Sequence, residues 1–190
     1  GNLYLARKKC GVTPDLEAYL QRIEGVIKNI ADIFDSAKTY EMIGSEEIVS
    51  IDVGNIVQNA ISLFSDIKDV KIENRCYGFK VLADSLLTQV FHNLIDNSLK
   101  YGSKIQKIKI YTVKNEDGSA KLCYEDDGVG IETDAKEHLF QKGFGKGTGY
   151  GLYLIRKISE VYGWSVQEKG QQGKGVLFEF EIPQNRIKSE

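Results

Sequence analysis

A long amphipathic helix is predicted near the start of the chain. Its apolar residues recur at alternating steps of four and three, and a further row widens the stripe to three positions in each heptad. The stripe consists of Leu16, Tyr19, Leu20, Ile23, Val26, Ile27, Ile30, Ile33, Phe34 and Ala37. Thr13 is a suitable N-cap, and Pro14 fits the first helical position.

Residues 3–9 have the pattern of the end of another helix, which Gly11 would close. We therefore expect residues 1–45 to be part of a helical hairpin. A stripe this wide needs more packing partners than the hairpin offers, which favours dimerisation with a second chain. The alternative is a helix that lies on the core of its own domain.

From residue 46 onward, short runs with strand periodicity alternate with helical patterns. Strands are predicted at 48–51, 70–75, 79–82, 108–113, 120–124, 165–169 and 176–182. Helices are predicted at 52–64, with Asp52 as its cap, at 85–101, with Asp84 as its cap, at 134–140 and at 151–162. Residues 46–190 should therefore form an α/β (α+β) two-layer sandwich, with a mixed sheet, three main helices on one face and a long loop from Gly130 to Gly147.

Composition narrows the class of protein. Hydrophobic residues make up 42% of the 190 positions, which excludes a disordered chain, and the net charge of −2 argues against a nucleic-acid binder. No apolar run approaches the ~20 residues that span a bilayer, and no signal peptide is expected. The widely spaced Cys10, Cys76 and Cys123 indicate reduced thiols and a cytoplasmic location.

A polar row lies on the predicted helix 85–101, away from its apolar face. Asn93, Asn97 and Lys100 are spaced to share one stripe. An asparagine oxygen can bind Mg²⁺ and a lysine can neutralise phosphate, so the row suits a metal-bound polyphosphate. Polar stripes are more often merely solvated, so the row alone does not identify a site.

A carboxylate at a strand end, Asp126, is followed by Gly128 and Gly130. Such a carboxylate can accept a hydrogen bond from an exocyclic amine, while the glycines let the chain turn beneath a flat ring. Adenine presents an amine there, whereas guanine presents a carbonyl oxygen. The alternative is an ordinary acidic turn.

Five glycines alternate with other residues between Gly143 and Gly151, and the run ends at a predicted helix start. Backbone N–H groups and the helix dipole favour an anion there. The run is neither a Walker loop, because Lys146 precedes glycine rather than serine or threonine, nor a dinucleotide fingerprint. A further run, Gly173-Lys174-Gly175, could approach a nucleotide, but we interpret it as a plain hairpin turn and leave it out of the site.

Four motifs occur in a fixed order along residues 48–183. They are Asn93…Asn97-Lys100-Tyr101, Asp126-x-Gly128-x-Gly130, Leu139-Phe140 and Gly147-Thr148-Gly149-Tyr150-Gly151-Leu152. In order and spacing they resemble the N, G1, F and G2 boxes of sensor histidine kinases, a branch of the Bergerat-fold ATPases. Residues 3–40 resemble, more loosely, the end of the dimerisation and histidine-phosphotransfer domain. The sequence of residues 139–149 is similar to that of archaeal sensor histidine kinases.

The resemblance implies roles for these residues. Asn97 would bind Mg²⁺, Lys100 the phosphates, and Tyr101 would lie beside the ATP. Asp126 would hold the adenine amino group, with Gly128 and Gly130 permitting the turn. Backbone groups of Gly147, Thr148, Gly149, Tyr150, Gly151 and Leu152 would bind phosphate, and Phe140 would anchor an ATP lid at 132–148. We further expect, from their place in the lid and not from a family motif, that Lys142 and Lys146 could reach the γ-phosphate.

Asn93 stands where hydrolytic relatives carry a glutamate base, which favours phosphoryl transfer over hydrolysis. The phosphoacceptor histidine is not expected in this chain: His92 and His138 are its only histidines, and they suit packing and solvated roles. The resemblance thus implies an ATP-binding catalytic fragment whose parent, cytoplasmic or membrane-anchored, forms a homodimer and passes phosphate to a response-regulator receiver domain. Alternatives are an anti-sigma-factor-type serine kinase, a chaperone- or gyrase-like hydrolase and a non-catalytic ATP-binding scaffold.

Overall fold

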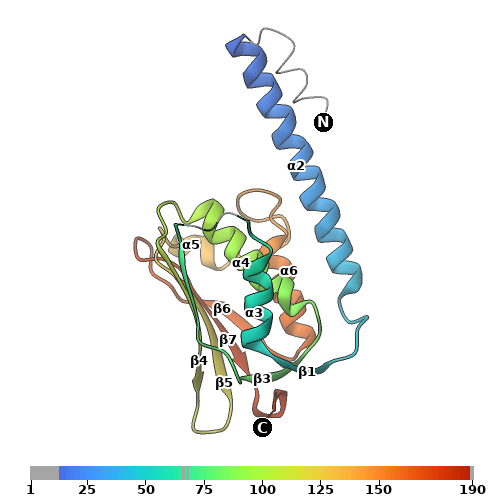
Figure 1. The fold of residues 1–190 in the computed structure, drawn as a ribbon, viewed down its shortest axis with the longest axis vertical. Helices are drawn as coiled ribbons and strands as arrows, with labels where there is room; N and C mark the ends of the chain where they lie inside the picture. Colours follow the sequence, from blue (N-terminus) through green and yellow to red (C-terminus); the bar gives the residue numbers. More distant parts are fainter. Residues whose placement is uncertain (1–12, 66, 68, 189–190) are drawn as a thin grey trace.

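The computed structural model describes residues 13–65, 67 and 69–188, with one long helix, α2 (Pro14–Met42), beside an α/β domain (Figure 1). Thr13 caps α2 as predicted, because its hydroxyl accepts a hydrogen bond from the Leu16 N–H at 3.3 Å, and Pro14 occupies the first turn. The predicted helix at residues 3–9 lies outside the described residues, so the hairpin stays a prediction.

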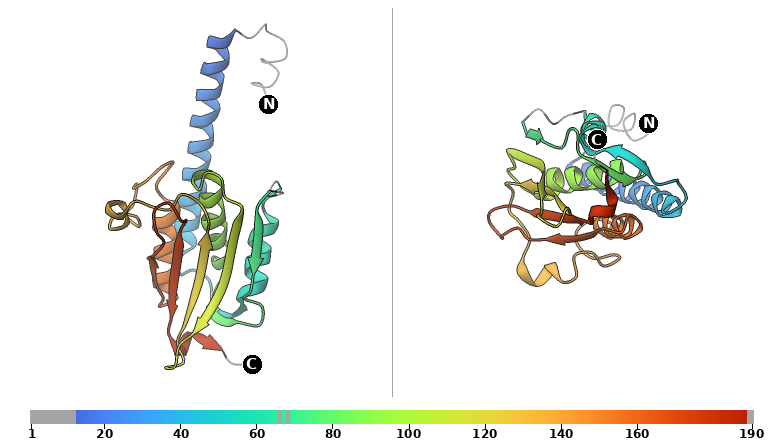
Figure 2. Two further views of the ribbon diagram at one scale, coloured as in Figure 1. Left: turned by 90° about the vertical axis from the view of Figure 1, so that its left-hand side faces the viewer. Right: turned by 90° about the horizontal axis from the view of Figure 1, so that it is seen from below.

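The apolar stripe of α2 is exposed to solvent over most of its length. Phe34 is 72% exposed and Tyr19 63%, whereas Leu20 is buried. The other exposed members are Leu16, Ile23, Val26, Ile27, Ile30 and Ile33. Figures 1 and 2 show why: most of α2 projects beyond the domain, and only its C-terminal part lies beside α6 (Gly151–Val161). The helix therefore does not pack along the core of its own domain.

The strands form two sheets rather than the single mixed sheet that the sequence pattern predicts. The larger has the order β2 (Lys71–Asn74), β4 (Lys107–Lys114), β5 (Ala120–Asp126), β7 (Leu177–Ile182), β6 (Ser165–Glu168). It is mixed as predicted, since β2 runs parallel to β4 and its other pairs are antiparallel. The smaller has the order β1 (Val49–Asp52), β3 (Lys80–Ala83), β8 (Ile187–Lys188).

Three helices cover one face of the larger sheet: α3 (Val53–Ser62), α4 (Leu87–Tyr101) and α6 (Figure 2). Asp52 caps α3 as predicted, accepting from the Asn55 N–H at 2.9 Å. The core between the layers is apolar, and its fully buried members include Phe91, Ile95, Ile108, Ile110, Leu122, Ile155 and Phe180.

Two helix boundaries differ from the prediction. Helix α4 begins at Leu87 rather than 85, because the buried Asp84 carboxylate accepts from the Leu86 N–H and the Tyr162 hydroxyl instead of capping the helix. Helix α5 (Thr133–Lys136) ends before the predicted residue 140, because the chain continues in tight turns such as His138 N–H to Ala135 C=O.

The two cysteines within the described part, Cys76 and Cys123, are free and buried. Burial raises the pKa of the Cys76 thiol to about 12, so it is unreactive at neutral pH. Cys10 lies outside the described residues. Within the described ranges, no helix combines the length and the hydropathy needed to cross a bilayer.

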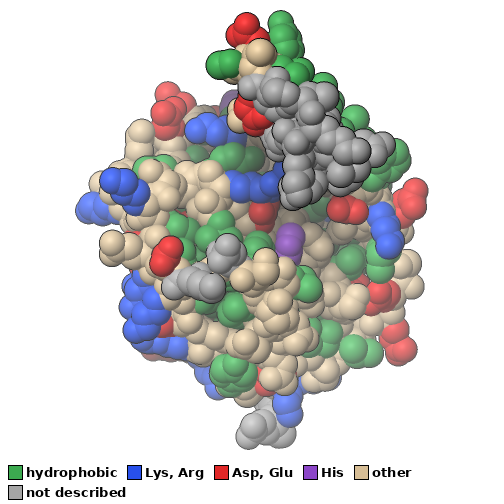
Figure 3. Space-filling view, turned by 45° about the horizontal axis from the view of Figure 1, so that its top comes forward, with side chains coloured by type: hydrophobic (Ala, Val, Ile, Leu, Met, Phe, Trp, Pro, Cys, Tyr) green, Lys and Arg blue, Asp and Glu red, His purple; other side chains and the backbone are tan. Residues whose placement is uncertain are grey.

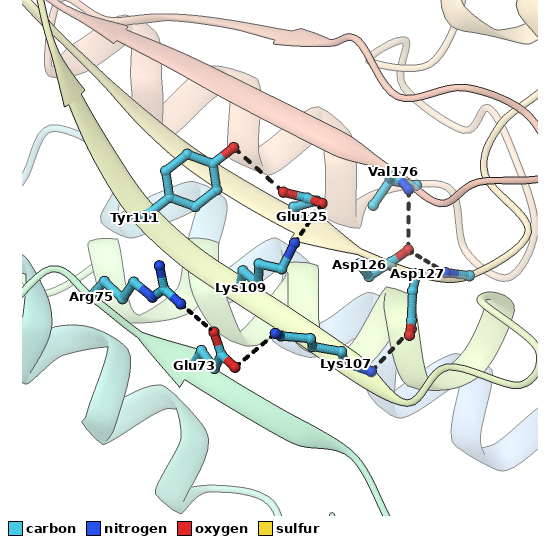
Figure 4. Close-up of polar contacts among 10 residues, drawn as sticks. Glu73, Arg75, Lys107, Lys109, Tyr111, Glu125, Asp126, Asp127 and Val176 are labelled. Atoms are coloured by element: carbon cyan, nitrogen blue, oxygen red, sulfur yellow. Dashed lines mark hydrogen bonds and ion pairs between the residues drawn. The ribbon is translucent and has the colours of Figure 1, made fainter.

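The face of the larger sheet opposite the helices carries ordered ion pairs (Figure 4). Glu73 contacts Lys107 at 2.7 Å, Arg75 at 2.8 Å and Lys71 at 3.1 Å, while Lys109 contacts Glu125 at 3.0 Å. Hydrogen bonds from Lys107 and Lys71 lower the pKa of Glu73 from 4.5 to about 2.

This ion-pair cluster predicts a pH dependence of stability. Because the pKa of Glu73 is lower in the folded chain than in the unfolded one, its contribution is present above pH 4.5 and is lost as pH falls from 4.5 towards 2. In Glu73→Gln the thermal unfolding midpoint should therefore fall less steeply across that window than in wild type. Glu116→Gln, at an exposed turn residue, is the matched control and should keep the wild-type slope.

Candidate functional site

A cavity of about 1450 Å³ lies between the polar side of α2, helix α4 and the glycine-rich segment before α6. Figure 3 shows the end of the domain that α2 overhangs, where basic side chains and a histidine are visible in a hollow. Of the residues predicted from sequence, the cavity is lined by Asn93, Asn97, Lys100, Tyr101, Asp126, Gly130, Lys146, Gly147, Thr148, Gly149, Gly151 and Leu152. Motifs more than 50 positions apart thus meet in one place.

Three other predicted residues do not line the cavity but adjoin residues that do. The Gly128 N–H donates to Asp126 Oδ1 at 3.0 Å. Phe140 packs edge-on against Phe178 with ring centroids 6.3 Å apart. Tyr150 lies beneath the Lys142 ammonium, 5.6 Å from its ring centroid, and directly precedes α6.

Helix α4 directs the polar row into the cavity towards the start of α6. Asn93 Nδ2 approaches the Gly151 carbonyl at 3.4 Å, and Gln89 Nε2 donates to Asn93 Oδ1 at 2.9 Å. Asn97 lies beside the same glycine: a Cβ at Gly151 would be 3.8 Å from its Nδ2. The two asparagines therefore face the N-terminus of α6, one turn apart.

Lys100 continues this row and contacts two carboxylates. Its Nζ lies 2.6 Å from Asp96 on the same helix and 3.9 Å from Asp32 of α2. Burial disfavours the charged ammonium, but these carboxylates outweigh burial, so the pKa of Lys100 is raised above its ordinary value. The cation is therefore kept at the wall of the cavity at neutral pH.

Another part of the cavity wall is formed by the buried Asp126 at the end of β5. Its Oδ1 accepts from the N–H groups of Gly128 at 3.0 Å and Val176 at 3.1 Å (the latter shown in Figure 4). Its Oδ2 accepts from the Ser98 hydroxyl at 2.5 Å. Asp126 is only 4% exposed. Its geometry is fixed by three donors from three separate segments.

Two of these donors were not among the predicted site residues. The run Gly173-Lys174-Gly175 forms the predicted turn but also packs on the site, because the Gly173 N–H donates to the Val129 carbonyl at 2.7 Å and the Val176 N–H donates to Asp126 Oδ1. Its paired glycines were the available signal. Ser98 follows Asn97 directly, but the helical pattern gives no sign that its hydroxyl has a functional role.

The glycine-rich segment forms a closed loop in front of α6. Gly143, Gly145, Gly147 and Gly149 all have positive φ. The Gly143 N–H donates to the Gly149 carbonyl at 3.1 Å, and a Cβ at Gly147 would be 2.6 Å from the Tyr101 hydroxyl. Such a loop before a helix N-terminus presents N–H groups that suit an anion.

A lysine on α5 ties the start of this loop region to the sheet. Lys136 Nζ lies 2.7 Å from Glu168 Oε2 of β6 and donates to the Gly170 carbonyl. The Glu168 side chain is 1% exposed, so the ion pair is buried on its acidic side.

The two histidines have local partners. His92 stacks on Phe64 with ring centroids 4.8 Å apart and lines the cavity. His138 contacts Gln141 at 2.8 Å and lies against Phe144.

Residues 83–186 match the family described as histidine kinase-, DNA gyrase B-, and HSP90-like ATPase. Among curated proteins, the phytochrome-like protein Cph1 of Synechocystis is 31% identical over 164 residues, covering 80% of this chain and 22% of Cph1. The sensor-like histidine kinase SenX3 of Mycolicibacterium smegmatis is 26% identical over 152 residues, covering 73% of this chain and 39% of SenX3. The chain thus spans well under half the length of these relatives.

Solved structures share the fold. The Acinetobacter baumannii histidine kinase AdeS superposes with a TM-score of 0.67 at 22% identity, covering 97% of this chain and 93% of AdeS. The catalytic domain of histidine kinase ThkA gives 0.61 at 28% identity, covering 73% of this chain and 99% of that domain. The predicted α/β sandwich and the resemblance to sensor histidine kinase catalytic domains are confirmed. Since the family match covers more than half of the chain, this protein belongs to the histidine kinase-, DNA gyrase B- and HSP90-like ATPase family.

Proposed function

We propose that this chain is the ATP-binding catalytic part of a sensor histidine kinase. Residues 1–45 would be part of the dimerisation hairpin, and 46–190 the catalytic domain. In the longer parent, the γ-phosphoryl group of Mg·ATP would pass to a histidine nitrogen of the dimerisation helix and then to a response-regulator aspartate. The observation that carries this proposal is a single cavity with a buried acceptor at Asp126 and a cationic, glycine-rich end at Lys100 and 143–151.

The Asp126 end suits a purine with an exocyclic amine. Its carboxylate is buried, lines the cavity and has no cationic partner among the described residues. A ring amine would donate a hydrogen bond to this carboxylate. Gly130 lets the chain beside Asp126 pack closely on the 171–175 loop, because a Cβ at Gly130 would lie 2.6 Å from the Gln171 carbonyl oxygen.

The other end suits a triphosphate. Lys100 supplies an ammonium group that Asp96 and Asp32 keep charged, and residues 147–151 supply backbone N–H groups at the N-terminus of α6. Lys146 also lines the cavity and could neutralise the γ-phosphate. In phosphoryl transfer such positioning and charge neutralisation provide most of the catalysis.

Magnesium would be held mainly by the nucleotide itself. Among the described residues no group of three or more His, Cys, Asp or Glu side chains is placed to hold a metal. Asn97 offers an amide oxygen at the cavity wall, which fits a hard cation that keeps phosphate and water oxygens as its other ligands. The bound ion would neutralise phosphate charge.

Asn93 supports transfer rather than hydrolysis. It lines the cavity next to Gly151 and has no carboxylate with which to deprotonate water. A homologous structure, at 23% identity, is described as ThkA in complex with the response regulator protein TrrA. That complex makes a receiver domain a reasonable final acceptor for this chain's parent.

The proposal is tested by mixing this chain with Mg·ATP and a separate, intact dimerisation hairpin, and assaying for acid-labile phosphohistidine. Formation of phosphohistidine on the hairpin supports it. Phosphoserine would favour the serine-kinase alternative, rapid phosphate release without an acceptor would favour a hydrolase, and ATP binding without any turnover would favour a scaffold.

The metal role of Asn97 has its own test. In Asn97→Ala, calorimetry should show a weaker nucleotide affinity in Mg²⁺ but an unchanged affinity in EDTA, because only the metal-bound form uses the amide oxygen. Asn59→Ala, at an exposed asparagine of α3, is the matched control and should behave as wild type in both buffers. An equal loss with and without metal would contradict the ligand role.

A further inference from the structure

A chain of hydroxyl groups lies behind Asp126. The Tyr124 hydroxyl donates to Ser98 Oγ at 2.8 Å, and the Ser98 hydroxyl donates to Asp126 Oδ2 at 2.5 Å. Tyr124 is 0% exposed, while Ser98 and Asp126 are each 4% exposed. Ser98 lines the cavity, whereas Tyr124 lies beneath it and acts on the site only through Ser98.

The direction of both hydrogen bonds is fixed by the carboxylate. Asp126 can only accept while ionised, so the Ser98 proton points to it, and the remaining serine lone pairs accept from Tyr124. Burial above all, together with the nearby Asp126 charge, raises the pKa of Tyr124, so the phenol keeps its proton. Linked hydrogen bonds of this kind polarise and strengthen one another.

The Asp126 carboxylate keeps little acceptor capacity for a ligand. Asp126 Oδ1 already accepts two N–H groups, from Gly128 and Val176, and Oδ2 accepts one proton from Ser98. About one lone pair is left, on Oδ2. Both hydroxyl protons of the chain are committed, so this cluster offers a ligand an acceptor and no donor.

We propose that Ser98 and Tyr124 determine base selectivity by holding the ionised Asp126 carboxylate so that the free lone pair of Oδ2 faces the base, which admits a 6-amino purine and rejects a 6-oxo purine. This inference rests on the proposed ATP-binding function. A 6-amino group donates to the free lone pair, whereas a 6-oxo group places its oxygen against the carboxylate. Such discrimination is large because the 6-oxo purine leaves buried polar groups without a hydrogen-bond partner. Tyr124 is a positioning residue, because it acts through Ser98.

The test compares ADP with IDP, which differ at position 6, by calorimetry on the full chain. Wild type should bind ADP at least tenfold more tightly than IDP. Ser98→Ala frees the carboxylate to turn, so the ratio of the two dissociation constants should fall about tenfold, mainly through weaker ADP binding. Tyr124→Phe keeps the ring but removes the donor to Ser98 Oγ, which weakens the linked hydrogen bond from Ser98 to Asp126, so the ratio should fall less, about threefold.

Two control variants remove buried hydroxyls elsewhere. The Ser159 hydroxyl donates to the Ile155 carbonyl in α6, and the Tyr162 hydroxyl donates to Asp84. Ser159→Ala and Tyr162→Phe should keep the wild-type ratio, whatever they cost in stability.

The outcomes separate this inference from the function on which it rests. Equal weakening of ADP and IDP in folded Ser98→Ala and Tyr124→Phe, or a wild-type ratio near one, would overturn the selectivity role while leaving nucleotide binding intact. Failure of wild type to bind either nucleotide would instead overturn the proposed function. If Ser98→Ala does not fold, Tyr124→Phe and the wild-type ratio still decide.

Discussion

Asp126→Asn should weaken ATP binding by about 10- to 150-fold, the equivalent of the ~1.5–3 kcal/mol that a hydrogen bond to a charged group contributes. The amide oxygen of asparagine can still accept from the Gly128 and Val176 N–H groups at the Oδ1 position. The amide nitrogen, however, replaces the acceptor at Oδ2 with a donor, which opposes both the Ser98 proton and the ring amine. The loss should therefore appear in binding more than in folding.

Calorimetric titration with ATP measures this loss, and the neighbouring carboxylate provides the control. Asp127 Oδ1 accepts from the backbone N–H groups of Lys107 at 3.0 Å (Figure 4) and Gln106 at 2.9 Å. Asp127 does not line the cavity. Asp127→Asn removes the same charge one residue away and should leave ATP affinity unchanged. An Asp126→Asn variant that binds ATP normally would refute the assignment of Asp126 to the adenine amine.

Gly175→Ala should lower the free energy of unfolding by about 2–5 kcal/mol, the sum of backbone strain and overpacking. Gly175 has a φ of +108°, and a Cβ there would lie 1.9 Å from the Asp126 carbonyl oxygen. Because backbone atoms lie on both sides of this contact, the steric clash can be relieved only if the 170–176 loop moves away from β5. Such a movement also withdraws the Val176 N–H from Asp126, so ATP affinity should fall as well.

Urea denaturation measures this change, and Gly173→Ala is its control. Gly173 also has a positive φ, +83°, but a Cβ there meets nothing within 4 Å. Gly173→Ala should therefore lower the free energy of unfolding only by the strain of the left-handed conformation, about 1–2 kcal/mol. Equal destabilisation by the two variants would show that the close approach to Asp126 does not constrain the loop.

Most elements of the fold could be predicted because their signals are local. Thr13 and Asp52 cap their helices through side chains three residues from the N–H groups they bind, and alternation locates every strand longer than three residues. Strand partners are not local. The pairing of β1 with β3, and of β3 with the two-residue β8, separates a second sheet from the first, and periodicity contains no information about partners.

The site divides in the same way. Asn97, Lys100, Asp126 and the glycine-rich segment could be found because each motif is compact and their order is distinctive. The contacts that hold Asp126 in place could not, because Ser98 and Val176 lie 28 and 50 residues from it in the chain. The prediction for Asp84 was wrong because of a distant contact. Its position suits a helix cap, but its carboxylate accepts a hydrogen bond from the Tyr162 hydroxyl, 78 residues away.

The strand order of the larger sheet also affects how this protein can associate with other molecules. Its edge strands, β2 and β6, are only four residues long, and charged side chains such as Lys71 and Glu73 stand on the β2 edge. Short, charged edges are poor templates for the addition of a strand from another molecule. Growth of the sheet from one copy to the next is therefore discouraged, which leaves the exposed apolar stripe of α2 as the surface through which the proposed dimer would form, by pairing of helices rather than strands.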